Sequence, residues 1–449
     1  MEISYHLLKR GLSITVDGVS VSITYPQGVF EKLTLPQKKL VCANLVYAKT
    51  IPLRLIKNNR VMKYRTPVPV LKPFFDSALI GDIARVNDQS DYMTNETLFQ
   101  RFLDTAVLFL SNDFEAPGDF SCDGNRALLT MSFGKDSLLS YCLAREMGIP
   151  YRLVFIRDIH GDDEMDMKLR IAKRFMKEQG EEMIEVIDRS DELYNDERIN
   201  VATLEICQSN AMNSFLLGLV PVAHHCSARY IALGNEKNLD YPFMDDEGYT
   251  CYYSYEQTEE WTLQQDVFMR LLTGGKLGVI SLVKPLPSIA EIKVLYGRYP
   301  DIARYQMSCT LDDAADGKKN HWCENCPTCT ETYLYLKAFG LDPGKFGLKK
   351  DLLAKKFESC FPLFDGEDIT AYEKSRNVRD ENLLAFYLAY KRGVEGYCMD
   401  IFKRRYLKEA RRREKRLRKL FLAPHETPLV PPEYRKALYA IFREELNSI

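Results

Sequence analysis

The spacing of apolar residues changes along the chain, and each change predicts a different element. Residues 13–16 and 19–23 alternate apolar and polar side chains on either side of Asp17-Gly18, a pair that favours a two-residue hairpin turn. The pattern therefore predicts two antiparallel strands. Further on, Asn95-Glu96-Thr97 is expected to begin a helix that runs through Val107 and Leu110.

The middle of the chain has the spacing of a strand, a helix and a second strand. Residues 127–131 form a short apolar run suited to a buried strand. Apolar residues between Leu138 and Met147 then recur every three or four positions, as on one face of a helix. Gly148-Ile149-Pro150 ends that helix, and residues 151–156 form the next apolar run. Because the connections are short, the unit predicts a parallel sheet.

Strands and helices continue to alternate toward residue 345. Strands are expected at residues 183–187 and 230–233, with a helix at 203–219 between them. We therefore expect an α/β protein with a parallel sheet and helices on both faces. The chain is expected to divide into an N-terminal α+β region (1–120), an α/β domain (121–345) and a helical C-terminal region (346–449).

The turn between the first of these strands and its helix carries the chemistry. A helix N-terminus offers unpaired N–H groups and a partial positive charge, which favour an anion. Gly134 allows a ligand to approach the backbone, Lys135 adds a cation, and Asp136 suits a magnesium ion between phosphates. We expect a pyrophosphate-sized site formed by Ser132, Phe133, Gly134, Lys135, Asp136 and Ser137. The simpler alternative is an ordinary turn capped by serine or aspartate.

A second polar group follows the strand at residues 230–233. Gly234-Asn235-Glu236 comes directly after that apolar run. In open parallel sheets, ligands lie beyond the carboxyl ends of the strands, so this segment should face the same crevice as residues 132–137. Taken alone, it would be interpreted as a tight turn.

Four cysteines have the spacing of a metal site. Cys323, Cys326 and Cys329 are separated by two residues each, and Cys309 lies upstream. Four thiolates make a closed tetrahedral site that suits structural zinc. An iron–sulfur cluster uses the same ligands and is the less favoured alternative. His321 is close enough in sequence to replace one thiol.

Composition narrows the classes of function. A net charge of −2 predicts no bulk attraction to nucleic acid or membrane, and a hydrophobic fraction of 46% is ordinary for a globular protein. The sequence shows neither an apolar run long enough for a transmembrane helix nor a signal-peptide core, and it contains twelve cysteines. We therefore expect a cytoplasmic location. Residues 403–419 carry eleven basic and two acidic residues. That run could bind RNA, but a solvated helix face is the favoured interpretation.

The turn at residues 132–137 also resembles a known signature. Its sequence, Ser-Phe-Gly-Lys-Asp-Ser, is similar to the SGGxDS motif of the PP-loop ATP pyrophosphatases, with Phe133 where the motif has its first glycine. The resemblance implies the adenine nucleotide alpha-hydrolase-like fold, ATP and Mg²⁺ as cofactors, and cleavage of ATP to AMP and pyrophosphate. It also implies that Lys135 and Asp136 are catalytic. Gly234-Asn235-Glu236 resembles the short motif that these enzymes carry at the equivalent strand end.

With Tyr253-Ser254 and the cysteine cluster, the chain looks closest to the MurL-type ATP-dependent epimerases. Those enzymes invert the terminal L-glutamate of UDP-N-acetylmuramoyl-L-alanyl-L-glutamate. This resemblance implies a small-molecule carboxylate that is adenylated, after which a base removes the neighbouring proton. The candidate bases are His224, His225, Glu236 and Glu256.

Two alternatives stay open. The first is nucleobase or tRNA modification of the 7-cyano-7-deazaguanine synthase type, because those enzymes also pair such a loop with a four-cysteine zinc site. The second is a nucleotide-binding or RNA-binding protein without turnover, with Phe133 as the defect.

Overall fold

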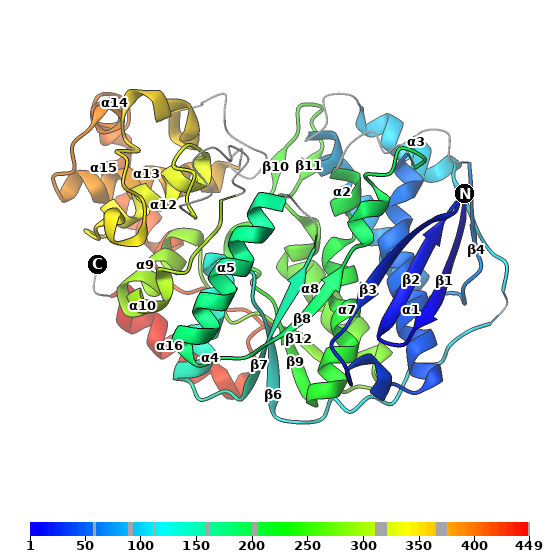
Figure 1. Ribbon diagram of the computed structural model, residues 1–449. Helices are drawn as coiled ribbons and strands as arrows, with labels where there is room; N and C mark the ends of the chain where they lie inside the picture. Colours follow the sequence, from blue (N-terminus) through cyan, green and yellow to red (C-terminus); the bar gives the residue numbers. More distant parts are fainter. Residues whose placement is uncertain are drawn as a thin grey trace.

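The computed structural model describes residues 1–56, 60–88, 93–111, 113–158, 162–199, 205–309, 321–364 and 375–447. One ten-stranded sheet crosses the molecule in the order β12-β9-β6-β7-β8-β3-β2-β1-β4-β5 (Figure 1). Its strands are β1 Glu2–Leu8, β2 Gly11–Val16, β3 Val19–Thr24, β4 Val61–Tyr64, β5 Ala106–Phe109, β6 Arg126–Thr130, β7 Tyr151–Arg157, β8 Met183–Asp188, β9 Ala228–Ala232 and β12 Gly278–Ile280.

The sheet is mixed but mostly parallel. The pairs from β12 to β8 are all parallel, as are β1 with β4 and β4 with β5. The predicted hairpin is confirmed, since Val16 pairs with Val19 across the turn. Strand β3 joins β8 in antiparallel orientation, so the hairpin continues the sheet that the central strands begin. The expected α/β fold is therefore confirmed, with the antiparallel part confined to β8, β3, β2 and β1.

Helices cover both faces of this sheet (Figure 1). Because successive residues of a strand point to opposite faces, Leu129 packs in one core and Leu128 in the other. The first core includes residues of α4 Lys135–Glu146, α5 Asp162–Gln179, α9 Ser288–Arg298 and α12 Pro327–Ala338. The second includes residues of α1 Leu35–Thr50, α2 Lys72–Asp88, α7 Ala211–Cys226 and α8 Glu259–Leu272.

The C-terminal region is helical and extends the first of these cores. It consists of α13 Arg376–Lys391, α14 Tyr397–Arg405, α15 Leu407–Phe421 and α16 Pro432–Leu446. Buried residues of all four helices belong to the same cluster as those of α4 and α9. Across the ranges described above, none of the helices has the length and apolar character that crossing a bilayer needs.

Two predicted helices differ from the observed ones. The helix expected to run to Leu110 is α3 Asn95–Asp104, and the next residues form β5 because they pair with β4. The helix expected at residues 203–219 begins outside the described residues, and its visible part is broken between α6 Glu205–Gln208 and α7. Asn210 causes the break, since its φ of 62° lies in the left-handed region.

Candidate functional site

The central strands place two loops at one end of the sheet. The chain runs outward from β6 through β7 to β8, and then returns to the other side of β6 as β9. Such a reversal of direction leaves a crevice beyond the carboxyl ends of the two strands. Residues 132–137 follow β6, and Gly234-Asn235-Glu236 follows β9, so the structure brings the two predicted segments together at this crevice.

The loop after β6 leads directly into the N-terminus of α4. Gly134 is the N-cap residue and no side chain caps the helix, which leaves the first N–H groups directed at the crevice. Ser137 Oγ donates to Gly134 O at 3.1 Å and accepts from Ser132 N at 3.3 Å, which closes the loop on itself. The loop therefore has the open helix N-terminus that an anion site requires.

Phe133 does not close this loop. Its φ is 64°, a left-handed conformation that glycine adopts readily and a bulky residue rarely does. The side chain is fully buried and lies edge-on to Phe175, with ring centroids 5.7 Å apart. The ring thus points into the core below the loop, and the strained backbone is held by aromatic packing.

Replacing Phe133 with glycine separates these two roles. Glycine suits the observed φ, so Phe133→Gly is expected to leave the affinity of the loop for an anionic ligand unchanged within a few-fold, as measured by titration with a fluorescent ATP analogue. Because the lost packing outweighs the relieved strain, we expect the free energy of unfolding to fall by about 2–3 kcal/mol. A large gain in nucleotide affinity would instead show that Phe133 obstructs the site.

Lys135 is surrounded by three carboxylates. Its Nζ lies 2.8 Å from Asp136 Oδ1, 3.1 Å from Glu236 Oε1 and 3.6 Å from Glu291 Oε2. Burial works against the charge of Lys135, but the three carboxylates outweigh it and raise its pKa well above the ordinary value. Burial, with the nearby Asp136 carboxylate, raises the pKa of Glu291 well above its usual range. Glu291, in the first turn of α9, is a site residue that no sequence pattern indicated.

The three carboxylates suit a divalent cation. One oxygen from each of Asp136, Glu236 and Glu291 lies within 4.8 Å of the others. When all three are ionised around a bound cation, the carboxylates exceed the single ammonium by two negative charges, and Glu291 Oε1 has no hydrogen-bond partner among the described residues. Carboxylate oxygens are the ligands that Mg²⁺ prefers, so this donor set fits the ion.

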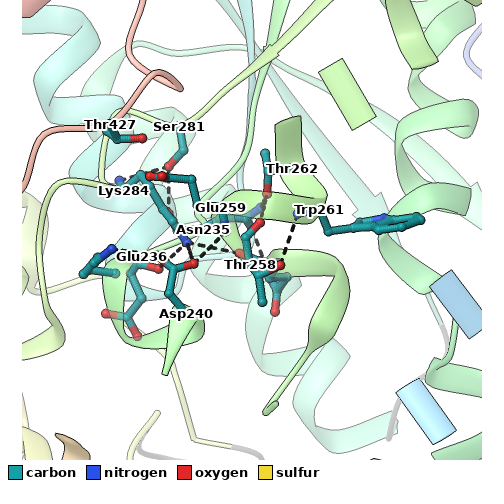
Figure 2. Close-up of polar contacts among 12 residues, drawn as sticks. Asn235, Glu236, Asp240, Thr258, Glu259, Trp261, Thr262, Ser281, Lys284 and Thr427 are labelled. Atoms are coloured by element: carbon teal, nitrogen blue, oxygen red, sulfur yellow. Dashed lines mark hydrogen bonds and ion pairs between the residues drawn. The ribbon is translucent and has the colours of Figure 1, made fainter. Parts of the chain in front are cut away.

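The segment after β9 packs closely against α4. A Cβ added to Gly234 would lie 2.8 Å from Asp136 Cβ, so only glycine permits this approach. Figure 2 shows how the next residue is fixed: Asn235 Nδ2 donates to Thr262 Oγ1 at 2.9 Å, and Ser281 Oγ donates to Asn235 O at 2.9 Å. Asn235 thus anchors the segment, while Glu236 is the member that faces Lys135.

Lys284 ties this segment to the following loop, as Figure 2 also shows. Its fully buried ammonium donates to Glu236 O at 3.0 Å, to Asp240 Oδ1 at 2.6 Å and to Gln257 O at 3.3 Å. Burial lowers the pKa of Lys284, although Asp240 opposes the shift. Because its three acceptors belong to segments flanking the crevice, Lys284 positions the walls of the site.

Removing that ammonium should destabilise the protein strongly. Lys284→Met leaves the Asp240 carboxylate without its closest cation, so we expect the free energy of unfolding to fall by about 3–5 kcal/mol. Lys276→Met is the matched control, because it removes an ion pair to an exposed Asp119 and should leave the unfolding midpoint nearly unchanged. Equal shifts in denaturant unfolding of the two variants would contradict the assignment.

Two adjoining pockets open at the loop. The first, the strand-end pocket, has a volume of about 280 Å³ and is lined by the ends of β6 and β7, by Ser132 and Ser137, and by Met212 and Phe215. The second, the cysteine-side pocket, has a volume of about 570 Å³ and extends from Lys135 to the start of α12. Its lining includes Glu236, Tyr253, Ser288, Gln306, Ser308, Thr328 and Tyr335. Asp136, Gly234 and Gln257 line both pockets, so the predicted loop stands at their boundary.

The four predicted cysteines come together beside the second pocket. Cys323 Sγ lies 3.7 Å from Cys329 Sγ, and Cys326 Sγ lies 3.8 Å from Cys309 Sγ. Sulfur atoms bound tetrahedrally to one ion at about 2.3 Å are separated by roughly 3.8 Å. The group therefore has the dimensions of a site for one metal ion such as zinc. His321 is not a member of this group.

The segment before Cys309 connects the cysteine group to the loop. Met307 N donates to Phe133 O at 2.8 Å, which holds the residue with the left-handed backbone. Gln306 Nε2 donates to Ser308 Oγ at 3.0 Å, and both residues line the cysteine-side pocket. A displacement of Cys309 can therefore move Met307, two residues earlier, and with it the hydrogen bond to Phe133 in the loop.

The structure separates the four candidate bases. His224 and His225 lie in the last turn of α7, before β9 begins, and so at the opposite end of the sheet from the crevice. Glu256 is buried and accepts from Met212 N and Asn213 N at the start of α7. Glu236 alone of the four lines the cysteine-side pocket.

The comparisons with known proteins add no family. No protein-family model matches the chain, and no curated protein matches it.

Proposed function

We propose that this protein cleaves ATP to AMP and pyrophosphate and transfers the adenylyl group to a small-molecule carboxylate. The observation that carries the proposal is the position of the Ser132–Ser137 loop at the boundary between the strand-end pocket and the cysteine-side pocket. An open helix N-terminus, one ammonium and three carboxylates meet there between two pockets. This arrangement suits a triphosphate in contact with a second reactant.

The chemistry assigns a role to each side of the boundary. A substrate carboxylate oxygen attacks the α-phosphorus, the bond to the α–β bridging oxygen breaks, and pyrophosphate leaves with that oxygen. In this proposal, Lys135 and the first N–H groups of α4 stabilise the negative charge that the leaving group gains. A bound Mg²⁺, held by Asp136, Glu236 and Glu291, would neutralise phosphate charge. We assign ATP to the strand-end pocket and the carboxylate to the cysteine-side pocket.

The resemblance to the UDP-muramoyl dipeptide epimerases names a particular substrate. Adenylation removes the negative charge of the carboxylate, which makes the neighbouring C–H more acidic. Glu236 is the base to test, because it is the candidate that lines the cysteine-side pocket. Incorporation of solvent deuterium at the α-carbon that is lost in Glu236→Gln while formation of AMP and pyrophosphate persists would support this assignment.

A nucleobase substrate is the second candidate. Tyr253 lines the cysteine-side pocket with an exposed side chain whose ring can stack on a base, and Cys326 lies in the same lining. These lining residues favour a nucleobase enzyme of the 7-cyano-7-deazaguanine synthase type as the second function to test.

One assay distinguishes these possibilities. Pyrophosphate and AMP are measured with ATP and a panel that includes UDP-muramoyl dipeptides, free amino acids and carboxylated deazapurines. We expect stoichiometric AMP and pyrophosphate with one member of the panel. Formation of ADP and phosphate would contradict the proposal, and nucleotide binding without cleavage for the whole panel would favour a non-catalytic protein.

A further inference from the structure

Positive charge is concentrated on one helix of the C-terminal region. Helix α15 carries eight basic and two acidic residues, a net charge of +6, in a chain whose total is −2. Lys408, Arg412, Lys415 and Lys419 recur at three- and four-residue spacing and fall within about 60° of one another around the helix axis. We call these four residues the α15 basic face.

The basic face points away from the core. Its four side chains are exposed, whereas Ala410, Leu417 and Phe421 on the opposite side of α15 are fully buried. Figure 1 shows α15 at the edge of the molecule, on the far side from β1 and β4. The face is therefore accessible and is not part of the pockets described above.

The acidic residues of α15 do not neutralise this face. Glu409 pairs with Arg413 at 2.7 Å, and Glu414 pairs with Arg418 at 3.0 Å and Lys391 at 3.1 Å. In the part of the chain that the structure describes, no ion pair involves any of the four residues of the basic face. Cations four residues apart, such as Lys408 with Arg412 and Lys415 with Lys419, repel one another. A bound polyanion would relieve that repulsion.

We infer that the α15 basic face binds the phosphodiester backbone of nucleic acid. A membrane is disfavoured because an interfacial helix must insert an apolar face, and the apolar face of α15 is buried in the core. A protein partner is disfavoured because protein interfaces have an apolar centre and few lysines. A row of lysine and arginine side chains without apolar neighbours fits a regular row of phosphates. This function goes beyond the proposed adenylation and does not depend on it.

The test uses the full chain and fluorescein-labelled nucleic acids of one length: duplex RNA, duplex DNA and single-stranded RNA. Anisotropy titrations are run between 50 and 300 mM KCl. We expect binding that weakens steeply with salt, by about 0.9 in the log–log slope for each phosphate contact with a duplex. Lys408→Gln/Arg412→Gln/Lys415→Gln/Lys419→Gln should bind on the order of 100-fold more weakly at 100 mM KCl, with a slope smaller by about 3–4.

A matched variant controls for net charge. Lys9→Gln/Arg10→Gln/Lys39→Gln/Lys63→Gln removes four exposed charges near the N-terminus and should bind as the wild type does. Circular dichroism checks that both variants fold. Equal affinity for RNA and DNA, or preference for one, supports backbone binding and identifies the source of the phosphates. No binding at 50 mM KCl, equal losses in both variants, or binding only to phosphatidylserine vesicles would overturn the inference.

Discussion

Asp136→Asn is expected to reduce pyrophosphate release from ATP by at least about 1,000-fold while the protein remains folded. Asp136 lies in the first turn of α4, contributes to the three-carboxylate group and holds the Lys135 ammonium at 2.8 Å. Asparagine keeps the shape of the side chain but removes its charge, so the change weakens both cation binding and the position of Lys135. Lys135→Met should cause a comparable loss, because it removes the cation at the loop.

A second substitution in the same helix provides the control. Glu146→Gln alters the far end of α4, where Glu146 forms an ion pair with Arg298 at 2.6 Å outside both pockets. It should leave turnover within a few-fold of the wild type. Steady-state pyrophosphate release and thermal melting are measured for all variants. Wild-type rates in both Asp136→Asn and Lys135→Met would remove the loop from the chemistry, whatever the protein binds.

The sequence predicted those parts of the site whose residues lie close together along the chain. The loop at residues 132–137 and the cysteines at 323–329 are local patterns, and the structure brings each together as expected. Gly234-Asn235-Glu236 was found through the general rule that parallel strands end at one edge. These predictions needed the order of elements along the chain and no knowledge of distant contacts.

The parts that were missed depend on contacts between distant segments. Glu291 enters the site because α9 packs beside α4, and its signal was a lone acidic residue in the apolar first turns of a helix. Lys284 follows the short strand β12, which no pattern predicted. The direction of the Phe133 ring depends on Phe155 and Phe175, which belong to other elements. Spacing along one segment carries no information on such packing.

Removal of the metal from the cysteine group is expected to weaken nucleotide binding as well as stability. Without an ion, four thiols lie within 4.8 Å of one another and lose the bonds that would hold them together. Cys309 is then free to move, and Met307, two residues earlier, donates the hydrogen bond to Phe133 O. Losing one such bond costs about 1–1.5 kcal/mol, so the dissociation constant for ATP should rise about tenfold.

Cys309→Ser and Cys326→Ser are the variants for this prediction, and Cys226→Ser is the matched control. Cys226 is a buried thiol in the last turn of α7, outside the cysteine group. Metal content by mass spectrometry should be about one zinc per wild-type chain and per Cys226→Ser chain, and well below one in the other two. Thermal melting then measures stability, and titration with a fluorescent ATP analogue measures the affinity of the loop for nucleotide.

If the metal-depleted variants melt at a lower temperature but bind the analogue as tightly as the wild type, the cysteine group stabilises the fold without positioning the loop. If both readouts fall together, the result supports transmission through the Met307 contact, because neither Cys309 nor Cys326 lines the strand-end pocket.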